Sequence, residues 1–86
     1  MTTLTAEQKV DRLLDAGQAG CGELLMLIFE EMKTLAPSQI LQVIGYDPGA
    51  REDIPAWSRL TGNRLLAMET IAVDGSAQTS YFIQKR

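Results

Sequence analysis

The spacing of apolar residues along the chain alternates between a helical and an extended period, and these changes predict two helices and four strands. Between residues 23 and 35, apolar side chains recur at helical spacing, so this segment is expected to form an amphipathic helix that Pro37 ends. Residues 40–46 are rich in β-branched side chains and nearly all apolar, which is typical of an interior strand. The full prediction is a strand at 10–15, a helix at 23–35, a strand at 40–46, a helix starting from an N-cap at Asp53, and strands at 64–73 and 79–84.

The connections carry recognisable turn chemistry. Residues 16–22 hold three glycines and form a predicted loop. Pro55 fits the first turn of the second helix, and Gly62 with Asn63 provides the stop signal after it. Residues 74–76, Asp-Gly-Ser, favour a hairpin between the last two strands.

The predicted order β-α-β-α-β-β indicates an α/β (α+β) two-layer sandwich, with a mixed four-stranded sheet and both helices on one face. A chain of 86 residues has room for one hydrophobic core. We therefore expect a flexible N-terminal tail at 1–9 and a single domain at 10–86.

Two residue counts restrict the chemistry. The chain has one cysteine and no histidine, which excludes an internal disulfide, a Cys/His zinc site, a Ser-His-Asp triad and a Cys-His dyad. The formal net charge of −3 disfavours direct binding to nucleic acid, which depends on neutralising phosphates. We expect no metal and no organic cofactor.

The N-terminal residues lack the apolar core of a secretory signal, and no apolar run approaches the roughly 20 residues that span a bilayer. We expect a cytoplasmic protein that does not act at a membrane. A lone thiol suits that reducing compartment.

Cys21 is the main candidate for chemistry. It lies between Gly20 and Gly22, at or just before the start of the first helix. Helix N-termini carry partial positive charge and unpaired amides, both of which favour a thiolate over a thiol. Glu23 opposes this effect by repulsion. The thiol is either a nucleophile or a small apolar packing residue.

Several ordered motifs resemble the TusA/SirA-like sulfurtransferase family of small sulfur carriers. The family pattern has a strand ending in Leu-Asp-Ala, a glycine-containing loop, and a cysteine at the start of the first helix; Leu14, Asp15 and Ala16 and then Cys21 match it in register. The resemblance runs from about Leu13 to Arg86. Its later parts are Asp47-Pro48, Asp53-Ile54-Pro55, Trp57, Gly62-Asn63-Arg64-Leu65 and Tyr81-Phe82-Ile83-Gln84-Lys85-Arg86.

The chain departs from this family at several positions. Gly22 and Leu24 stand where the family has the prolines of Cys-Pro-x-Pro, so the sequence reads Cys-Gly-Glu-Leu. Gly20 replaces a basic residue that commonly precedes the cysteine, and Asn63 replaces a histidine. Ser58 stands where some members carry a second cysteine.

The resemblance implies a persulfide relay in which Cys21 takes sulfur from a donor protein and passes it to an acceptor. The implied donor is a cysteine desulfurase or a rhodanese-type protein, and the implied acceptor is of the DsrE/TusBCD type. We expect the partners to contact Gly20, Gly22, Glu23, Asp47 and Arg51.

Two other functions stay open. The chain could be a non-catalytic interaction or regulatory module with a structural cysteine, which the missing prolines favour. RNA binding is suggested by a resemblance of the fold to the C-terminal domain of translation initiation factor three, but the net charge opposes it.

Overall fold

The computed structural model describes residues 10–86, apart from the side chain of Cys21. The expected tail at 1–9 lies outside the described residues. The elements in chain order are β1 (Arg12–Gly17), α2 (Cys21–Met32), β2 (Ile40–Gly45), α3 (Ala50–Thr61), β3 (Arg64–Val73) and β4 (Ser76–Gln84).

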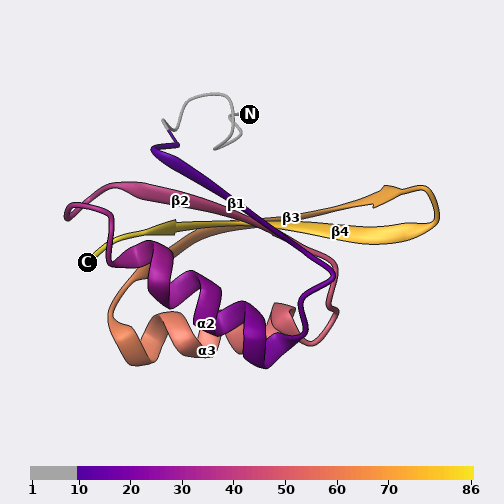
Figure 1. The fold of residues 1–86 in the computed structure, drawn as a ribbon, viewed down its shortest axis with the longest axis horizontal. Coiled ribbons are helices and arrows are strands. Elements are labelled where there is room, and N and C mark those ends of the chain that lie inside the picture. The colour runs from indigo at the N-terminus through magenta and orange to yellow at the C-terminus, as the bar shows by residue number, and fades with distance from the viewer. Residues whose placement is uncertain (1–9) are drawn as a thin grey trace.

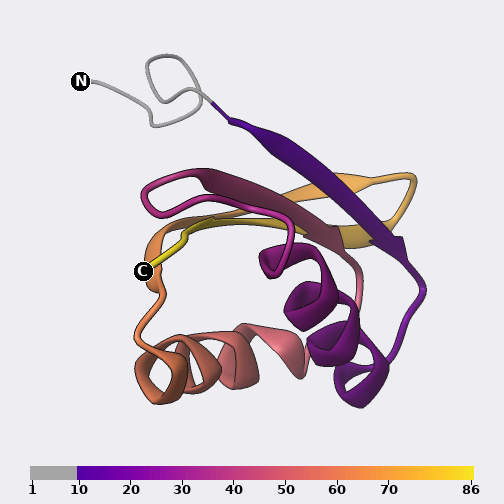
Figure 2. The ribbon, with the colours of Figure 1, turned by 60° about the vertical axis from the view of Figure 1, so that its left-hand side comes forward.

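The strands form one mixed sheet with the order β1-β2-β4-β3. β1 and β2 are parallel, while β4 pairs antiparallel with both β2 and β3. Both helices lie on one side of this sheet (Figure 1). Figure 2 shows the helix layer and the sheet layer separately. The predicted two-layer sandwich is therefore confirmed.

The core lies between the helices and the face of the sheet that they cover. Apolar residues recur every three or four positions on α2 and every two on β2 and β4, so each element presents one apolar side to the other layer. The fully buried side chains of this cluster include Leu24, Ile28, Leu41, Val43, Ile54, Tyr81 and Ile83.

The prediction that Asp53 caps the second helix is wrong. α3 begins at Ala50, and Asp53 lies in its first turn. The cause is the preceding turn: the Asp47 side chain accepts a hydrogen bond from the Gly49 amide (3.1 Å), and the Ala50 amide donates to the Asp47 carbonyl (3.1 Å). Pro55 consequently lies inside the helix, where its missing N–H removes the usual bond to the Arg51 carbonyl.

Other boundaries also shift. α2 begins at Cys21 instead of residue 23 and ends at Met32 instead of 35, because the Thr34 and Leu35 amides bond three residues back and tighten the chain. β1 reaches Gly17, which pairs with Gly45, and β4 begins at Ser76.

The predicted turns are confirmed at Gly62 and at the hairpin. Gly62 has φ 80° and donates to the Ser58 carbonyl, which ends α3. Val73 pairs with Ser76, so Asp74 (φ 49°) and Gly75 (φ 81°) form a two-residue turn of the type that right-twisted hairpins favour. No helix among the described residues is long and apolar enough to cross a membrane.

Candidate functional site

Both helices begin at the same end of the sheet (Figure 1). β1 and β2 are parallel, so their C-terminal ends share one edge, and each leads through a short connection into a helix. We call residues 17–23 and 46–51 the Cys21 end. The parallel pairing of β1 and β2 brings the two segments to this end.

The backbone around Cys21 starts α2 without a side-chain cap. Gly20 is the N-cap, with extended angles, and its carbonyl accepts the first helical hydrogen bond from the Leu24 amide (2.7 Å). A Cβ atom built on Gly20 or Gly22 would meet no atom within 4 Å. The chain on either side of Cys21 therefore borders open space.

The strand-to-helix connection before Cys21 is a folded turn. Asp15 accepts a hydrogen bond from the Gly17 amide (3.0 Å), and the Ala19 amide donates to the Ala16 carbonyl (3.1 Å). Gly17 has φ 57°, a left-handed conformation that glycine adopts without strain. These local bonds fix where the helix starts.

The charged residues expected at the site lie at this end but form no ion pair with one another. Glu23 is exposed in the first turn of α2, and Arg51 is exposed in the first turn of α3. Within residues 10–86, neither forms an ion pair. Asp47 is half-buried and holds the turn before α3, so its observed role is structural.

The Cys21 end is anchored directly beneath its open surface. Leu24, three residues into α2, is fully buried, and its Cδ2 lies 3.6 Å from the Cβ position of Gly45 at the end of β2. Ala50 and Ile54 are likewise buried at the start of α3. Buried side chains thus support the exposed surface of the Cys21 end.

The chemistry available at the Cys21 end is that of a helix N-terminus. The first amides of a helix have no acceptor within it, and Gly20 offers no side chain to cap them. They and the helix dipole stabilise an anion, including a thiolate, placed at this position. Among the described residues, no group of three or more Cys, Asp or Glu is arranged to hold a metal ion.

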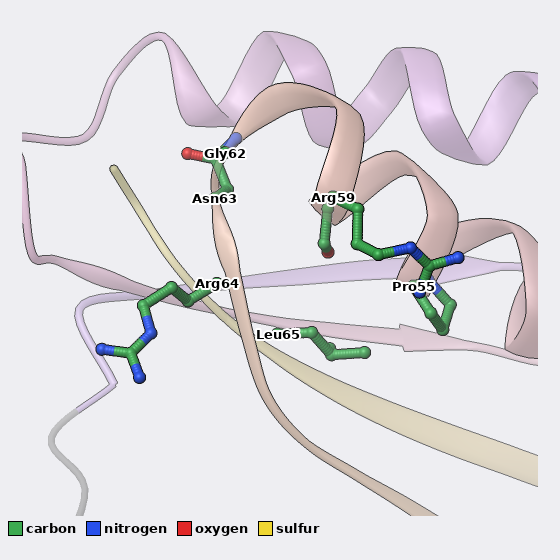
Figure 3. A pocket seen from close by; sticks show the side chains of 7 residues that line it. Pro55, Arg59, Gly62, Asn63, Arg64 and Leu65 are labelled. Atoms are coloured by element: carbon green, nitrogen blue, oxygen red, sulfur yellow. The ribbon is translucent and has the colours of Figure 1, made fainter.

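A cavity of about 500 Å³ lies elsewhere, at the C-terminal end of α3. Its lining includes Ser58, whose buried hydroxyl has no hydrogen-bond partner among the described residues. Figure 3 shows the Arg59 side chain extending toward Pro55, whereas Arg64 points to the opposite side. The two guanidinium groups therefore do not converge on one ligand.

A second cavity, which sequence analysis did not anticipate, lies where both helices end. Phe29, Lys33 and Trp57 line it together with Lys85 and Arg86. The spacing of Phe29 and Lys33 already places them on one face of α2. Only the fold brings Trp57 and the last two residues beside them.

Comparison of the sequence with known proteins identifies relatives of this chain. The family model "Sulfurtransferase TusA" matches residues 12–85, which include every element of the structure. The chain belongs to the TusA sulfurtransferase family. The expected family is therefore confirmed.

Individual relatives match over nearly their full length. The sulfur carrier protein TusA of Pseudomonas paraeruginosa (strain PA7) is 32% identical over 77 residues, which cover 90% of this chain and 92% of the relative. TusA of Pseudomonas putida (strain F1) is 32% identical over 76 residues, covering 88% of this chain and 90% of the relative. The match to TusA thus covers most of the described domain.

Proposed function

We propose that this TusA family member is a sulfur carrier that relays persulfide sulfur through Cys21. The observation that carries the proposal is that α2 begins at the chain's single cysteine, between two glycines whose surroundings are open. Membership in a family whose relatives are named sulfur carriers supports the same function.

The transfer is a pair of thiol–persulfide exchanges. The Cys21 thiolate attacks the terminal sulfur of a donor persulfide; a new S–S bond forms on Cys21, the donor S–S bond breaks, and the donor leaves as a thiolate. An acceptor thiolate then attacks the terminal sulfur of the Cys21 persulfide and releases the Cys21 thiolate. Both steps conserve the oxidation level, so no further oxidant or reductant is needed.

The Cys21 end provides a surface for this exchange. Two sulfur atoms must come into contact, so the partner's reactive loop has to approach the start of α2. Gly20 and Gly22 leave room for that approach, and Glu23, Asp47 and Arg51 form the charged margin that the partner meets. The proposed donor is a cysteine desulfurase or a rhodanese-type protein, the acceptor is of the DsrE/TusBCD type, and the exchange takes place in the cytoplasm.

The lost prolines do not prevent the helix from starting at Cys21. Their usual effect is to fix the first helical turn. Here the Gly20 carbonyl bonds the Leu24 amide, and Leu24 itself is buried against β2. This backbone bond and the packing of Leu24 therefore hold the start of α2 in this chain.

The decisive experiment measures sulfur loading by intact mass. The protein is incubated with a cysteine desulfurase and cysteine, or with polysulfide, and wild type is compared with Cys21→Ser. We expect a reductant-labile gain of one sulfur atom in wild type and none in the variant. Ser58→Ala, which changes a buried hydroxyl remote from Cys21, is the matched control and should load normally.

Two outcomes would overturn the proposal. One is an unloaded wild-type protein whose Cys21 also alkylates slowly at neutral pH, which would favour the non-catalytic interaction module. The other is equal sulfur gain in Cys21→Ser, which would place the sulfur on a different group.

A further inference from the structure

The second cavity lies at the end of the helices remote from Cys21. Its volume is about 370 Å³, and it is bounded by the last turns of α2 and α3 and by the residues that follow β4. Two aromatic rings, Phe29 and Trp57, and three cationic side chains, Lys33, Lys85 and Arg86, line it. We call these five residues the cationic cleft.

Two of the cations are held in place by the backbone. Lys85 Nζ donates to the Met32 carbonyl (2.6 Å) at the end of α2, and Arg86 Nη1 donates to the Thr61 carbonyl (3.3 Å) at the end of α3. The Arg86 amide donates to Asn63 Oδ1 (2.9 Å). Cations favour helix C-termini because the carbonyls there carry partial negative charge.

These contacts leave most of the positive charge of the cleft uncompensated. Among the described residues, Lys85 and Arg86 form no ion pair with a carboxylate, and no acidic side chain lines the cleft. Lys33 pairs with Glu30 at 3.5 Å, but both side chains are more than half exposed. Exposed pairs of this kind are weak, so the carboxylate of a partner can compete with Glu30 for Lys33. The cleft is thus a local positive site on a chain whose net charge is −3.

The walls add an apolar component. Phe29 is 48% exposed, although it is a large aromatic residue, and Lys33 Nζ lies 4.7 Å from the centre of its ring. Trp57 packs against the core with one side and borders the cleft with the other. Exposed aromatic residues beside cations suit an occupant that has both apolar and anionic groups.

We propose that the cationic cleft is a docking site for an acidic segment of a partner protein, in which carboxylates flank one bulky apolar side chain. Charge complementarity selects the carboxylates, and the two rings receive the apolar side chain. The cleft and Cys21 lie at opposite ends of α2, which has 12 residues and is therefore about 18 Å long. The apolar side chain that the two rings receive would lie at the end of α2 opposite Cys21, and the proposal does not depend on sulfur transfer.

Trp57 allows a direct test because it is the chain's only tryptophan. Wild-type protein, kept reduced, is titrated with the synthetic peptide Glu-Asp-Glu-Phe-Glu-Asp-Glu while tryptophan fluorescence is recorded. The expected result is a saturable change that weakens as salt is added. The same peptide with Gln and Asn in place of every acid should bind at least tenfold more weakly.

Matched charge variants locate the binding site. Lys33→Gln removes a cleft cation and should weaken binding about threefold to fivefold, which corresponds to one exposed charge pair. Arg59→Gln removes an exposed cation of α3 that lies outside the cleft, and binding should stay unchanged. Equal weakening by both variants would overturn the proposal, as would the absence of a saturable change.

Two competitors test other occupants. Tight displacement of the peptide by a short oligouridylate would assign the cleft to RNA instead of an acidic protein segment. A concentration-dependent change in tryptophan fluorescence without peptide, with doubling of the mass in sedimentation, would assign it to a second copy of this chain. Either result would overturn the proposal.

Discussion

The two ends of the helix layer are built in opposite ways. At the Cys21 end, α2 and α3 both start from glycine N-caps, and neither has a side-chain cap. At the other end, Lys85 and Arg86 bond the last turns of both helices. At the end remote from Cys21, side-chain hydrogen bonds from the two residues after β4 thus link the sheet to both helices.

Truncation of Leu24 should have the largest effect, because this residue anchors the open end from below. Leu24→Ala is expected to lower the free energy of unfolding by about 2–5 kcal/mol, the usual cost of removing a fully buried leucine. Denaturant unfolding measures the change. Met26→Ala, at a position that is 62% exposed, should change it by less than about 0.5 kcal/mol. Equal losses would mean that the start of α2 is not anchored as described.

A pair of glycine variants compares the two ends directly. Gly62→Ala should cost about 1–3 kcal/mol, because φ is 80° and the new Cβ would lie 2.7 Å from Arg86 Cδ. Gly22→Ala meets open space in a helical turn and should be neutral or stabilising by up to about 1 kcal/mol. Thermal unfolding of both variants gives the comparison. A destabilised Gly22→Ala protein would contradict the open structure of the Cys21 end.

Asn63 contributes less, through two hydrogen bonds at the closed end. Its Oδ1 accepts from the Arg86 amide, and its Nδ2 donates to Thr61 Oγ1 (3.1 Å). Asn63→Ala should cost about 1 kcal/mol in denaturant unfolding. Asn63→Asp keeps the acceptor for Arg86 and should recover part of the loss. A variant with no loss would show that these bonds do not hold the C-terminal residues.

Lys33→Gln should have the smallest effect on folding. Its ion pair with Glu30 is exposed, so the free energy of unfolding is expected to change by less than about 0.5 kcal/mol at low and at high salt. Binding of the acidic peptide should nevertheless weaken. A large loss of stability would show that the positive charge serves the fold instead of a partner.

Much of the fold follows from local sequence signals. The hairpin at Asp74 and Gly75 and the stop at Gly62 need backbone conformations that those residues favour, so sequence alone predicts them. The start of α3 was misplaced because Asp53 has good cap chemistry. The turn at Asp47 is stabilised by the Asp47 side chain and starts the helix earlier, at Ala50. Local residue preferences do not show which of the two aspartates determines the start of α3.

The site divides in the same way. Cys21 at the start of a helix was predicted from its position between a glycine-rich loop and an apolar repeat. Glu23 and Arg51 are predicted to contact a partner. They lie at the same end of the domain because β1 and β2 are parallel, which is a tertiary feature and not a local sequence signal. The cationic cleft joins residues 29, 33, 57, 85 and 86, and no local signal links positions so far apart.

The position of β1 at the edge of the sheet bears on how the domain opens. β4 has two strand neighbours and shares a two-residue turn with β3, whereas β1 has only β2, which it reaches across the whole of α2. Pairing between distant segments is slower to form, and edge strands open at lower free energy. Amide hydrogens of β1 should therefore exchange with deuterium before those of β4. The loop that leads to Cys21 follows directly from β1, so earlier exchange in β1 would place the start of α2 next to the part of the sheet that opens most easily.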